Sequence, residues 1–237
     1  PAIPTQFKED LSIDIEATQK HTEALVNNGI HGIVMLGTIG EGTSLTLSEK
    51  VEVLRATVEV AGGKVPVLSG IAEFTTQGAC DTVKAAGEAG VDGIMLLPAM
   101  VYKSDARETI AHFRTVANST HLPIMCYNNP PVYRVDITPE MFKELIDVEN
   151  IVVIKEASGD VRRITELFNA LNDRFLIFAG LDDVALESFM LGCTGWISGL
   201  VDAFPRENRA LWDAAMLGDY ERALEIYRWY MPMLRFD

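Results

Sequence analysis

The stretch Ile151-Val152-Val153-Ile154-Lys155 decides the fold, because it is a short run of mostly β-branched apolar residues that ends in a lysine. Such a run is typical of a parallel strand that is buried on both faces. A short loop follows, and then the segment Arg162–Leu171, whose apolar residues recur at helical spacing. This part of the chain therefore predicts a strand, a loop and a helix, which is the repeating unit of a parallel α/β fold.

The same alternation of short apolar runs and longer amphipathic segments extends along the chain. The expected strands are Ala2–Gln6, His31–Leu36, Val65–Gly70, Asp92–Leu97, Leu122–Tyr127, Ile151–Lys155, Phe175–Ala179 and Thr194–Ser198. The expected helices cover about Asp14–Asn28, Ser48–Ala61, Thr75–Ala89, Ala106–Ser119, Pro139–Asp147, Arg162–Leu171, Asp182–Leu191 and Pro205–Leu217. Eight strands and eight helices in strict alternation predict an α/β fold of the (β/α)8 type, the TIM barrel.

Helix boundaries are marked by local residues. Ser48 and the pair Thr138-Pro139 are expected to start helices, and glycines such as Gly90 are expected to end them. A further helix is expected at about Tyr220–Leu234. We expect residues 1–218 to form the barrel and residues 219–237 to form a C-terminal helix that continues the same domain. An open doubly wound sheet is the alternative, but the glycine spacing G-x-G-x-x-G is absent after a first strand.

Composition limits the classes of partner. The chain has 237 residues, of which 48% are hydrophobic, and a formal net charge of −14. That charge would repel both a nucleic-acid backbone and an anionic membrane surface, so we expect neither as a partner. Three widely separated cysteines indicate free thiols in a reducing compartment. With no leader and no apolar run near about 18 residues, the sequence predicts a soluble cytoplasmic protein.

Lys155 is the most informative candidate for chemistry. In a barrel of this kind, catalytic groups lie at the carboxyl ends of the strands, and Lys155 ends an apolar strand. Partial desolvation disfavours the ammonium form and supplies the free amine that attacks a carbonyl. The alternative is a lysine that extends to water or pairs with Glu156, and position alone does not separate the two.

Two residues with hydroxyl side chains lie at or just after the carboxyl ends of expected strands. Tyr127 ends the preceding strand, so its phenol is expected within reach of Lys155 and suited to move protons during Schiff-base chemistry. Thr38 lies in a glycine-bracketed turn, from which it is expected to relay a proton to Tyr127 and to offer backbone N–H groups to a carboxylate. The alternatives are a core tyrosine with a solvated hydroxyl and an ordinary turn threonine.

Other residues carry weaker signals. The four histidines share no metal-ligand spacing with each other or with cysteine, so we expect no metal site. Asp182 and Asp183 are interpreted as helix-start or surface carboxylates. The aromatic residues of the last helix are interpreted as packing against the barrel or a partner subunit.

Five motifs together resemble one known family. They are Gly37-Thr38-Ile39-Gly40-Glu41, Tyr127-Asn128-Asn129-Pro130, Ile154-Lys155-Glu156-Ala157-Ser158-Gly159-Asp160, Ala179-Gly180-Leu181-Asp182 and Gly195-Trp196-Ile197-Ser198-Gly199. In this order they resemble the dihydrodipicolinate synthase and N-acetylneuraminate lyase superfamily, and the resemblance covers essentially the whole chain. The resemblance implies a barrel enzyme that needs no metal or organic cofactor and that forms a homodimer or homotetramer.

The resemblance also implies roles for individual residues. Lys155 would form a Schiff base with pyruvate or another 2-keto acid, and Tyr127 would shuttle protons. The turn at Thr38, Ile39 and Gly40 would bind the substrate carboxylate. The backbones of Gly180 and Ile197 would line the pocket, and Arg134 would contact the substrate.

Some positions depart from the family pattern. Ile39 replaces the second threonine of the usual Gly-Thr-Thr-Gly-Glu turn, which removes a hydroxyl but keeps the amides. Synthases lend a tyrosine to the neighbouring subunit from a Pro-Tyr-Tyr segment, but the matching stretch here is Ala99-Met100-Val101, with Tyr102 as a possible substitute. Val132 stands where synthases carry an arginine, and Arg134 comes two places later. The C-terminal region of the family also continues beyond Asp237, so we expect this chain to correspond to part of a longer fold.

These departures predict a Schiff-base lyase other than a true dihydrodipicolinate synthase. The segments Ile71–Thr76, Tyr102–Ser104 and Asn129–Arg134 resemble members that degrade hydroxyproline-derived or sugar-acid-derived keto acids, by dehydration, deamination or aldol cleavage. Dihydrodipicolinate synthase itself is one alternative. A non-catalytic member that binds a metabolite as a sensor is the other.

Overall fold

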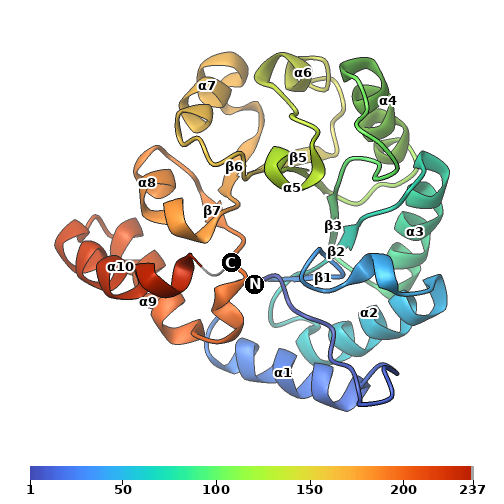
Figure 1. Ribbon diagram of the computed structural model, residues 1–237, viewed down its shortest axis with the longest axis horizontal. Helices are drawn as coiled ribbons and strands as arrows, with labels where there is room; N and C mark the ends of the chain where they lie inside the picture. Colours follow the sequence, from blue (N-terminus) through green and yellow to red (C-terminus); the bar gives the residue numbers. More distant parts are fainter. Residues whose placement is uncertain (236–237) are drawn as a thin grey trace.

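The computed structural model describes residues 1–235 and shows an α/β barrel in which helices surround a parallel sheet (Figure 1). Seven strands are hydrogen-bonded in chain order from β1 to β7, each parallel to the next. The strands are β1 (Ile33–Met35), β2 (Val67–Ile71), β3 (Gly93–Leu96), β4 (Ile124–Asn128), β5 (Ile151–Glu156), β6 (Leu176–Ala179) and β7 (Gly195–Trp196). This arrangement is the expected TIM-barrel type of fold.

The N-terminal segment joins the two edges of this sheet. Ala2 forms a parallel bridge with Val34, and the Ala2 N–H donates to the carbonyl of Ser198 at 2.9 Å. The expected strand Ala2–Gln6 is therefore wrong in its length, because its ladder is limited to this bridge. The bridge nevertheless sits between β1 and the residues after β7, at the position of a first barrel strand.

The outer helices follow the predicted segments, except that the helices expected at Pro139–Asp147 and Asp182–Leu191 are shorter than predicted. They are α1 (Ile15–Asn27), α2 (Leu47–Ala61), α3 (Thr76–Ala89), α4 (Ala106–Ala117), α6 (Pro139–Lys143), α7 (Arg162–Leu171), α8 (Ala185–Met190), α9 (Pro205–Met216) and α10 (Tyr220–Leu234). Short 3-10 turns lie at Gly42–Ser44, Asn172–Arg174, Asp182–Val184 and Leu200–Asp202. Of the expected C-terminal segment 219–237, α10 is described, and residues 236 and 237 lie outside the described part.

Capping residues explain several helix ends. Thr46 caps α2: its side chain accepts from the Glu49 N–H, and the Glu49 side chain accepts from the Thr46 N–H. The helix begins at Leu47, so the expected start at Ser48 is wrong by one residue. Thr138 caps α6 ahead of Pro139, as predicted. Gly90 ends α3 at φ +93°, in the left-handed region that residues with a Cβ rarely adopt.

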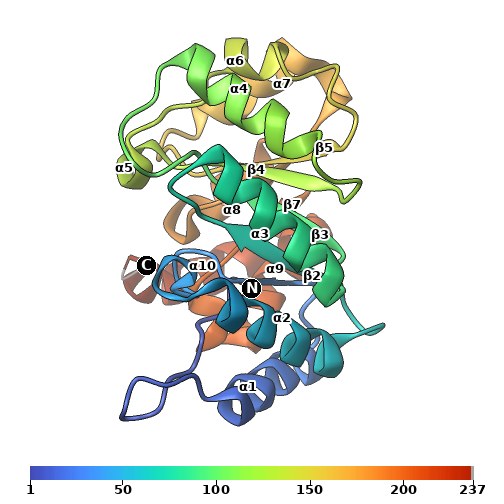
Figure 2. The same ribbon diagram turned by 90° about the vertical axis from the view of Figure 1, so that its right-hand side faces the viewer.

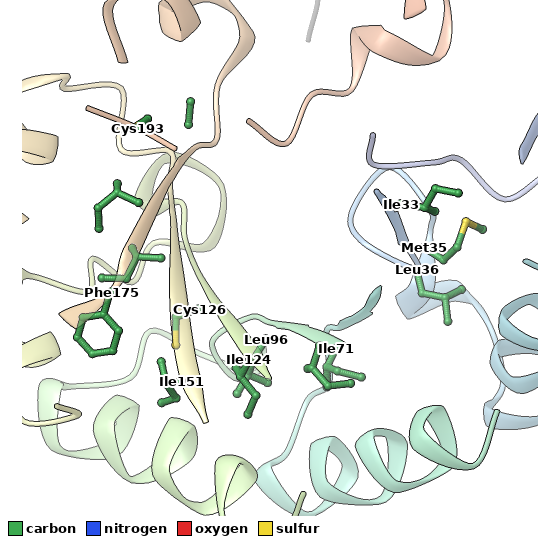
Figure 3. Packing of buried hydrophobic residues seen from close by; sticks show 14 of the residues in the cluster. Ile33, Met35, Leu36, Ile71, Leu96, Ile124, Cys126, Ile151, Phe175 and Cys193 are labelled. Carbon is green, nitrogen blue, oxygen red and sulfur yellow. The ribbon is translucent and has the colours of Figure 1, made fainter. Parts of the chain in front are cut away.

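Alternate residues of the strands form two separate layers. Residues such as Cys126 and Ile154 face outward into the large core between sheet and helices, where Ile71, Leu96, Ile124 and Ile151 point toward the surrounding helices (Figure 3). Met125, Tyr127 and Val153 face inward and form a second apolar cluster inside the barrel. Because strand side chains alternate between faces, Lys155 lies on the inward face with Val153, in line with this inner cluster.

A four-residue helix, α5 (Pro130–Tyr133), interrupts the regular alternation. It follows β4 directly, and it lies inside the ring of outer helices, at one end of the barrel (Figures 1 and 2). Asn129 caps it, since the Asn129 side chain accepts from the backbone N–H of Val132. This small helix folds the chain back over the barrel mouth and brings Tyr133 toward the inner cluster.

Candidate active site

Lys155 and Tyr127 meet inside the barrel mouth. They are direct partners in the register between β4 and β5, so their side chains leave the sheet side by side on one face. The Lys155 Nζ lies 3.7 Å from the centroid of the Tyr127 ring. Lys155 is 5% exposed and Tyr127 is 6% exposed. The structure thus places the expected amine and the expected phenol together in a buried position.

The Tyr127 hydroxyl is held by Asn129, for which the sequence predicted no role. The Asn129 side-chain amide donates to the Tyr127 hydroxyl at 3.0 Å, while the Asn129 oxygen caps α5. Because the hydroxyl accepts this bond, its own proton is directed elsewhere. Asn129 therefore orients Tyr127 and fixes α5 with one buried side chain.

Tyr133 is a second residue that sequence reasoning missed. Its ring meets the Tyr127 ring edge to face, with centroids 5.4 Å apart and an interplanar angle of 81°. Its hydroxyl forms a hydrogen bond with the hydroxyl of Thr38. Burial raises the pKa of Tyr133, and the neighbouring Tyr127 phenol raises it further. The only signal in the sequence was a tyrosine shortly after Tyr127 in a turn with two prolines.

Thr38 has a different partner from the one expected. The sequence predicted a direct relay from Thr38 to Tyr127, but the Thr38 hydroxyl contacts Tyr133. The reason is α5, which places the Tyr133 ring between the Thr38 turn and Tyr127. The hydroxyl side chains of Thr38, Tyr133 and Tyr127 therefore lie in a row that leads from the turn after β1 to β4, beside Lys155.

The turn that carries Thr38 is shaped by unusual backbone positions. Leu36 is buried and has φ +58°, a left-handed conformation that costs about 1–2 kcal/mol for a residue with a Cβ. Gly70 on β2 permits the close approach of this turn, because a Cβ there would lie 2.6 Å from the Leu36 carbonyl oxygen. Backbone strain of this kind is concentrated at functional sites.

Ile39 and Gly40 continue the turn. Among residues 1–235 the backbone N–H groups of Thr38 and Ile39 have no hydrogen-bond acceptor. Gly40 is buried, and its carbonyl accepts from the Thr5 hydroxyl at 2.7 Å. The turn is thus fixed to the N-terminal segment and leaves two consecutive N–H groups available, an arrangement suited to an anion.

The remaining expected residues lie on neighbouring loops. Gly180 follows β6, and its N–H donates to the Glu156 carbonyl at 2.8 Å. Ile197 follows β7 and packs partly buried against the inner cluster. Arg134 is exposed at the end of α5, and within the described chain its side chain has no ion pair or hydrogen bond. The structure therefore brings the backbone of Gly180 and the side chain of Ile197 to the barrel mouth, whereas the role of Arg134 stays a prediction.

Carboxylates near the site are structural. Asp182 is 1% exposed and accepts bonds from the Trp196 indole, the Ser198 hydroxyl and the Leu200 N–H. The interpretation of Asp182 as a surface carboxylate is therefore wrong, although it does start a 3-10 turn. Burial raises the pKa of Glu156, which accepts from Ser158 and Asn128. Glu156 alternates with Lys155 along β5 and so faces away from the barrel interior.

Within residues 1–235, no three His, Cys, Asp or Glu side chains lie together in a way that would hold a metal ion. In the same part of the chain, none of the helices has both the length and the apolar character that crossing a bilayer requires.

Comparison with known proteins places this geometry in a family. Residues 1–235 match the model of the dihydrodipicolinate synthetase family. A 4-hydroxy-tetrahydrodipicolinate synthase from Desulforamulus reducens is 34% identical over 235 residues, covering 99% of this chain and 79% of the relative.

Solved structures agree with the sequence match. The dihydrodipicolinate synthase of Aquifex aeolicus superposes with a TM-score of 0.94 at 34% identity, over 99% of this chain and 80% of that one. The chloride-inhibited synthase of Acinetobacter baumannii, solved with pyruvate, superposes with a TM-score of 0.95 at 29% identity, again over 99% and 80%. By sequence and fold, the chain belongs to the dihydrodipicolinate synthetase family.

Proposed function

We propose that this protein is a lyase that binds a 2-keto acid as a Schiff base on Lys155. Lyase chemistry is common to members of its family. The observation that carries the proposal is the pairing of Lys155 with Tyr127, because a buried amine beside a phenol is the arrangement that imine formation needs. The Acinetobacter relative was solved with pyruvate, which supports pyruvate as the keto acid.

The reaction begins at the keto carbon. The Lys155 amine adds to C2 of the keto acid, which forms a carbon–nitrogen bond and a carbinolamine. Loss of water from the carbinolamine gives the imine, and loss of a proton from C3 gives the enamine. The imine nitrogen accepts the electron pair that C3 releases when it loses its proton. The protein side chains therefore need only hold the substrate and move protons.

The carboxylate of the keto acid is assigned to the Thr38 turn. The N–H groups of Thr38 and Ile39 would donate to its oxygens. Ile39 offers only its amide here, since its side chain is apolar. Gly180 and Ile197 would enclose the rest of a small substrate, and their roles remain part of the proposal.

The names of the relatives favour 4-hydroxy-tetrahydrodipicolinate synthesis as the first candidate reaction. The synthases of Desulforamulus reducens and Aquifex aeolicus are each 34% identical to this chain. In that reaction the enamine carbon attacks an aldehyde and forms a carbon–carbon bond. The names of the relatives thus support dihydrodipicolinate synthase, an alternative in the sequence prediction, more strongly than a lyase for a hydroxyproline-derived or sugar-acid-derived keto acid.

A second candidate is favoured by two positions at the mouth. Val132 is 56% exposed where synthases of the resembling family carry an arginine, and Ala99-Met100-Val101 replaces their tyrosine segment. These residues would suit a substrate with one carboxylate better than a dicarboxylic product. A dehydratase, deaminase or aldolase acting on a substituted keto acid uses the same imine and remains the second candidate.

A panel assay separates these reactions. The purified protein is incubated with pyruvate and aldehydes, with 2-keto-3-deoxy sugar acids and with 1-pyrroline-4-hydroxy-2-carboxylate. Formation of 4-hydroxy-tetrahydrodipicolinate, ammonia, dehydrated product and pyruvate is scored side by side, and Lys155→Arg serves as the inactive control. Formation of one product that is lost in Lys155→Arg identifies the reaction. Turnover that persists in Lys155→Arg contradicts the Schiff-base mechanism. No turnover with any substrate would favour a metabolite sensor.

A further inference from the structure

Tyr133 connects the Thr38 turn to Tyr127 across the barrel mouth. Thr38 follows β1 and Tyr133 ends α5 after β4, so two strands, β2 and β3, separate them in the sheet. Their hydroxyl groups are nevertheless hydrogen-bonded. The Tyr133 ring also meets the Tyr127 ring edge to face, with the two ring centroids 5.4 Å apart.

The surroundings of Tyr133 keep its phenol neutral. Its ring packs partly buried against the inner apolar cluster. Burial raises the pKa of Tyr133, so the hydroxyl keeps its proton at neutral pH. A neutral phenol donates one hydrogen bond and accepts others at the same time. Tyr133 therefore has the bonding capacity to pass a proton between two neighbouring hydroxyl groups.

Imine formation at Lys155 requires such a transfer. Both protons of the neutral amine end on the oxygen of the keto group, which leaves as water while the carbon–nitrogen double bond forms. No net proton is consumed, but each proton must leave nitrogen and reach oxygen. Tyr127 is the phenol whose ring the amine contacts, and a partner that returns its proton allows Tyr127 to act in each step.

We propose that Tyr133 is a positioning residue that links Tyr127 to Thr38 in a proton relay built entirely from one chain. The inference rests on the proposed Schiff-base function and adds a residue to it. Asn129 contributes by donating to the Tyr127 hydroxyl, which leaves the Tyr127 proton for Tyr133 or the substrate. Thr38 is exposed and forms the end of the relay that contacts solvent.

Tyr102, the substitute considered from the sequence, is placed differently. It is 64% exposed, and its hydroxyl donates to Glu108 at 3.0 Å at the start of α4. Within the described chain it makes no bond with Tyr127, Tyr133 or Thr38. Tyr102 is therefore a matched control, a tyrosine with one hydrogen bond outside the relay.

The experiment measures how fast the imine forms. Wild type, Tyr133→Phe, Thr38→Val, the double variant and Tyr102→Phe are mixed with pyruvate in single-turnover amounts, and borohydride reduction at successive times traps the adduct for mass spectrometry. We expect Tyr133→Phe to slow adduct formation by at least about tenfold, because proton transfer contributes about 100- to 10,000-fold in general acid–base catalysis. The final amount of adduct and the pyruvate KM should stay unchanged, because Phe keeps the ring contact with Tyr127.

The double variant tests whether the two hydroxyl groups act as one unit. If they do, Tyr133→Phe combined with Thr38→Val is no slower than the slower single variant, because residues of one relay are not additive. Tyr102→Phe should react at the wild-type rate. If Tyr133→Phe does not fold, as judged by circular dichroism, Thr38→Val alone decides, and a wild-type rate in that variant overturns the relay.

The outcomes separate this inference from the function on which it rests. A Tyr133→Phe protein that forms adduct at the wild-type rate overturns the relay while the Schiff-base function stands. A raised KM with unchanged rate also overturns it, because Tyr133 would then only shape the carboxylate turn. Failure of the wild type to form any adduct removes the proposed function, and the relay with it.

Discussion

Lys155 lies across the ring face of Tyr127, its direct partner on the neighbouring strand, with the Nζ 3.7 Å from the ring centroid. The parallel register of β4 and β5 fixes this pair, because residues at matched positions of adjacent strands leave the sheet on the same side. The contact has two parts that substitutions can separate. The ring packs against the Lys155 side chain, whereas the hydroxyl, which is hydrogen-bonded to Asn129, is the proposed proton-transfer group.

Tyr127→Phe removes the hydroxyl and keeps the ring. We expect kcat to fall about 100- to 10,000-fold, because the general acid–base group is lost while the contact with Lys155 remains. The free energy of unfolding should fall by about 1 kcal/mol, since Asn129 loses one hydrogen-bond acceptor. Steady-state kinetics and urea unfolding measure the two effects. A variant with wild-type kcat would show that Tyr127 only packs against Lys155.

Asn129→Ala removes both the donor to Tyr127 and the cap of α5. We expect unfolding to become easier by about 0.5–2 kcal/mol, as for other lost N-caps, and kcat to fall because Tyr127 and Tyr133 lose their orientation. Thr138→Ala is the control, because it removes the cap of α6 without touching the site. Equal kcat values for the two variants would argue against an orienting role for Asn129.

Gly180→Ala tests the close packing of the loop after β6. A Cβ at this position would lie 2.7 Å from the Glu156 carbonyl oxygen and 2.8 Å from the Ala157 Cβ, so backbone must shift. We expect a loss of about 1–3 kcal/mol in unfolding free energy. Activity should fall as well, because β5 carries Lys155 immediately before this contact.

Gly87→Ala is the matched control for that substitution. Gly87 lies within α3, and a Cβ there would meet its nearest atom at an ordinary distance of 3.6 Å. Alanine in a helix interior should raise the unfolding free energy by about 0.5–1 kcal/mol. Thermal unfolding of both variants should therefore shift in opposite directions, and a shift of Gly180→Ala in the same direction as Gly87→Ala would refute the packing argument.

His112 is expected to make stability depend on pH. Burial lowers the pKa of His112 from its usual 6.5, and the ring contacts the Leu97 carbonyl and the Thr76 hydroxyl. At pH values below 6.5, the unfolded chain binds a proton at His112 that the folded chain does not bind. The folded state is therefore more stable at higher pH, and this stability is lost as the pH falls from 6.5 toward the lowered pKa of His112. The slope contributed by this group reaches at most about 1.4 kcal/mol per pH unit.

Urea unfolding between neutral and mildly acidic pH measures this effect. We expect His112→Gln to lose less stability on acidification than the wild type, although it is less stable at neutral pH. His121→Gln, at an exposed position, is the control for the loss of a histidine side chain. If His112→Gln and the wild type show the same pH dependence, His112 does not titrate as described.

The sequence predicted the helices and the order of the strands well, because both depend on local patterns. Residues such as Ile164, Leu167 and Leu171 recur at helical spacing, and α7 has the expected bounds. The first strand was predicted too long. Only Ala2 pairs with Val34 there, since pairing depends on partners distant in the chain, which a run of apolar residues does not specify.

The site was predicted in part for the same reason. Lys155 and Tyr127 end consecutive strands, so their contact follows from the barrel itself. The partner of Thr38 did not follow, because it depends on the four-residue α5, which no hydrophobic period indicates. Asn129 and Tyr133 were visible in the sequence as turn residues. Asn129 contacts Tyr127, and Tyr133 contacts Thr38, only because α5 folds back over the barrel mouth.

Location of the imine is the most direct test of the central claim. The protein is reduced with borohydride in the presence of pyruvate, digested, and its peptides are identified by mass spectrometry, with Lys143→Arg as an exposed lysine control. The account predicts one reduced pyruvate adduct on Lys155, formed equally in Lys143→Arg and absent in Lys155→Arg. An adduct on another lysine, or none with pyruvate or any other 2-keto acid, would contradict it.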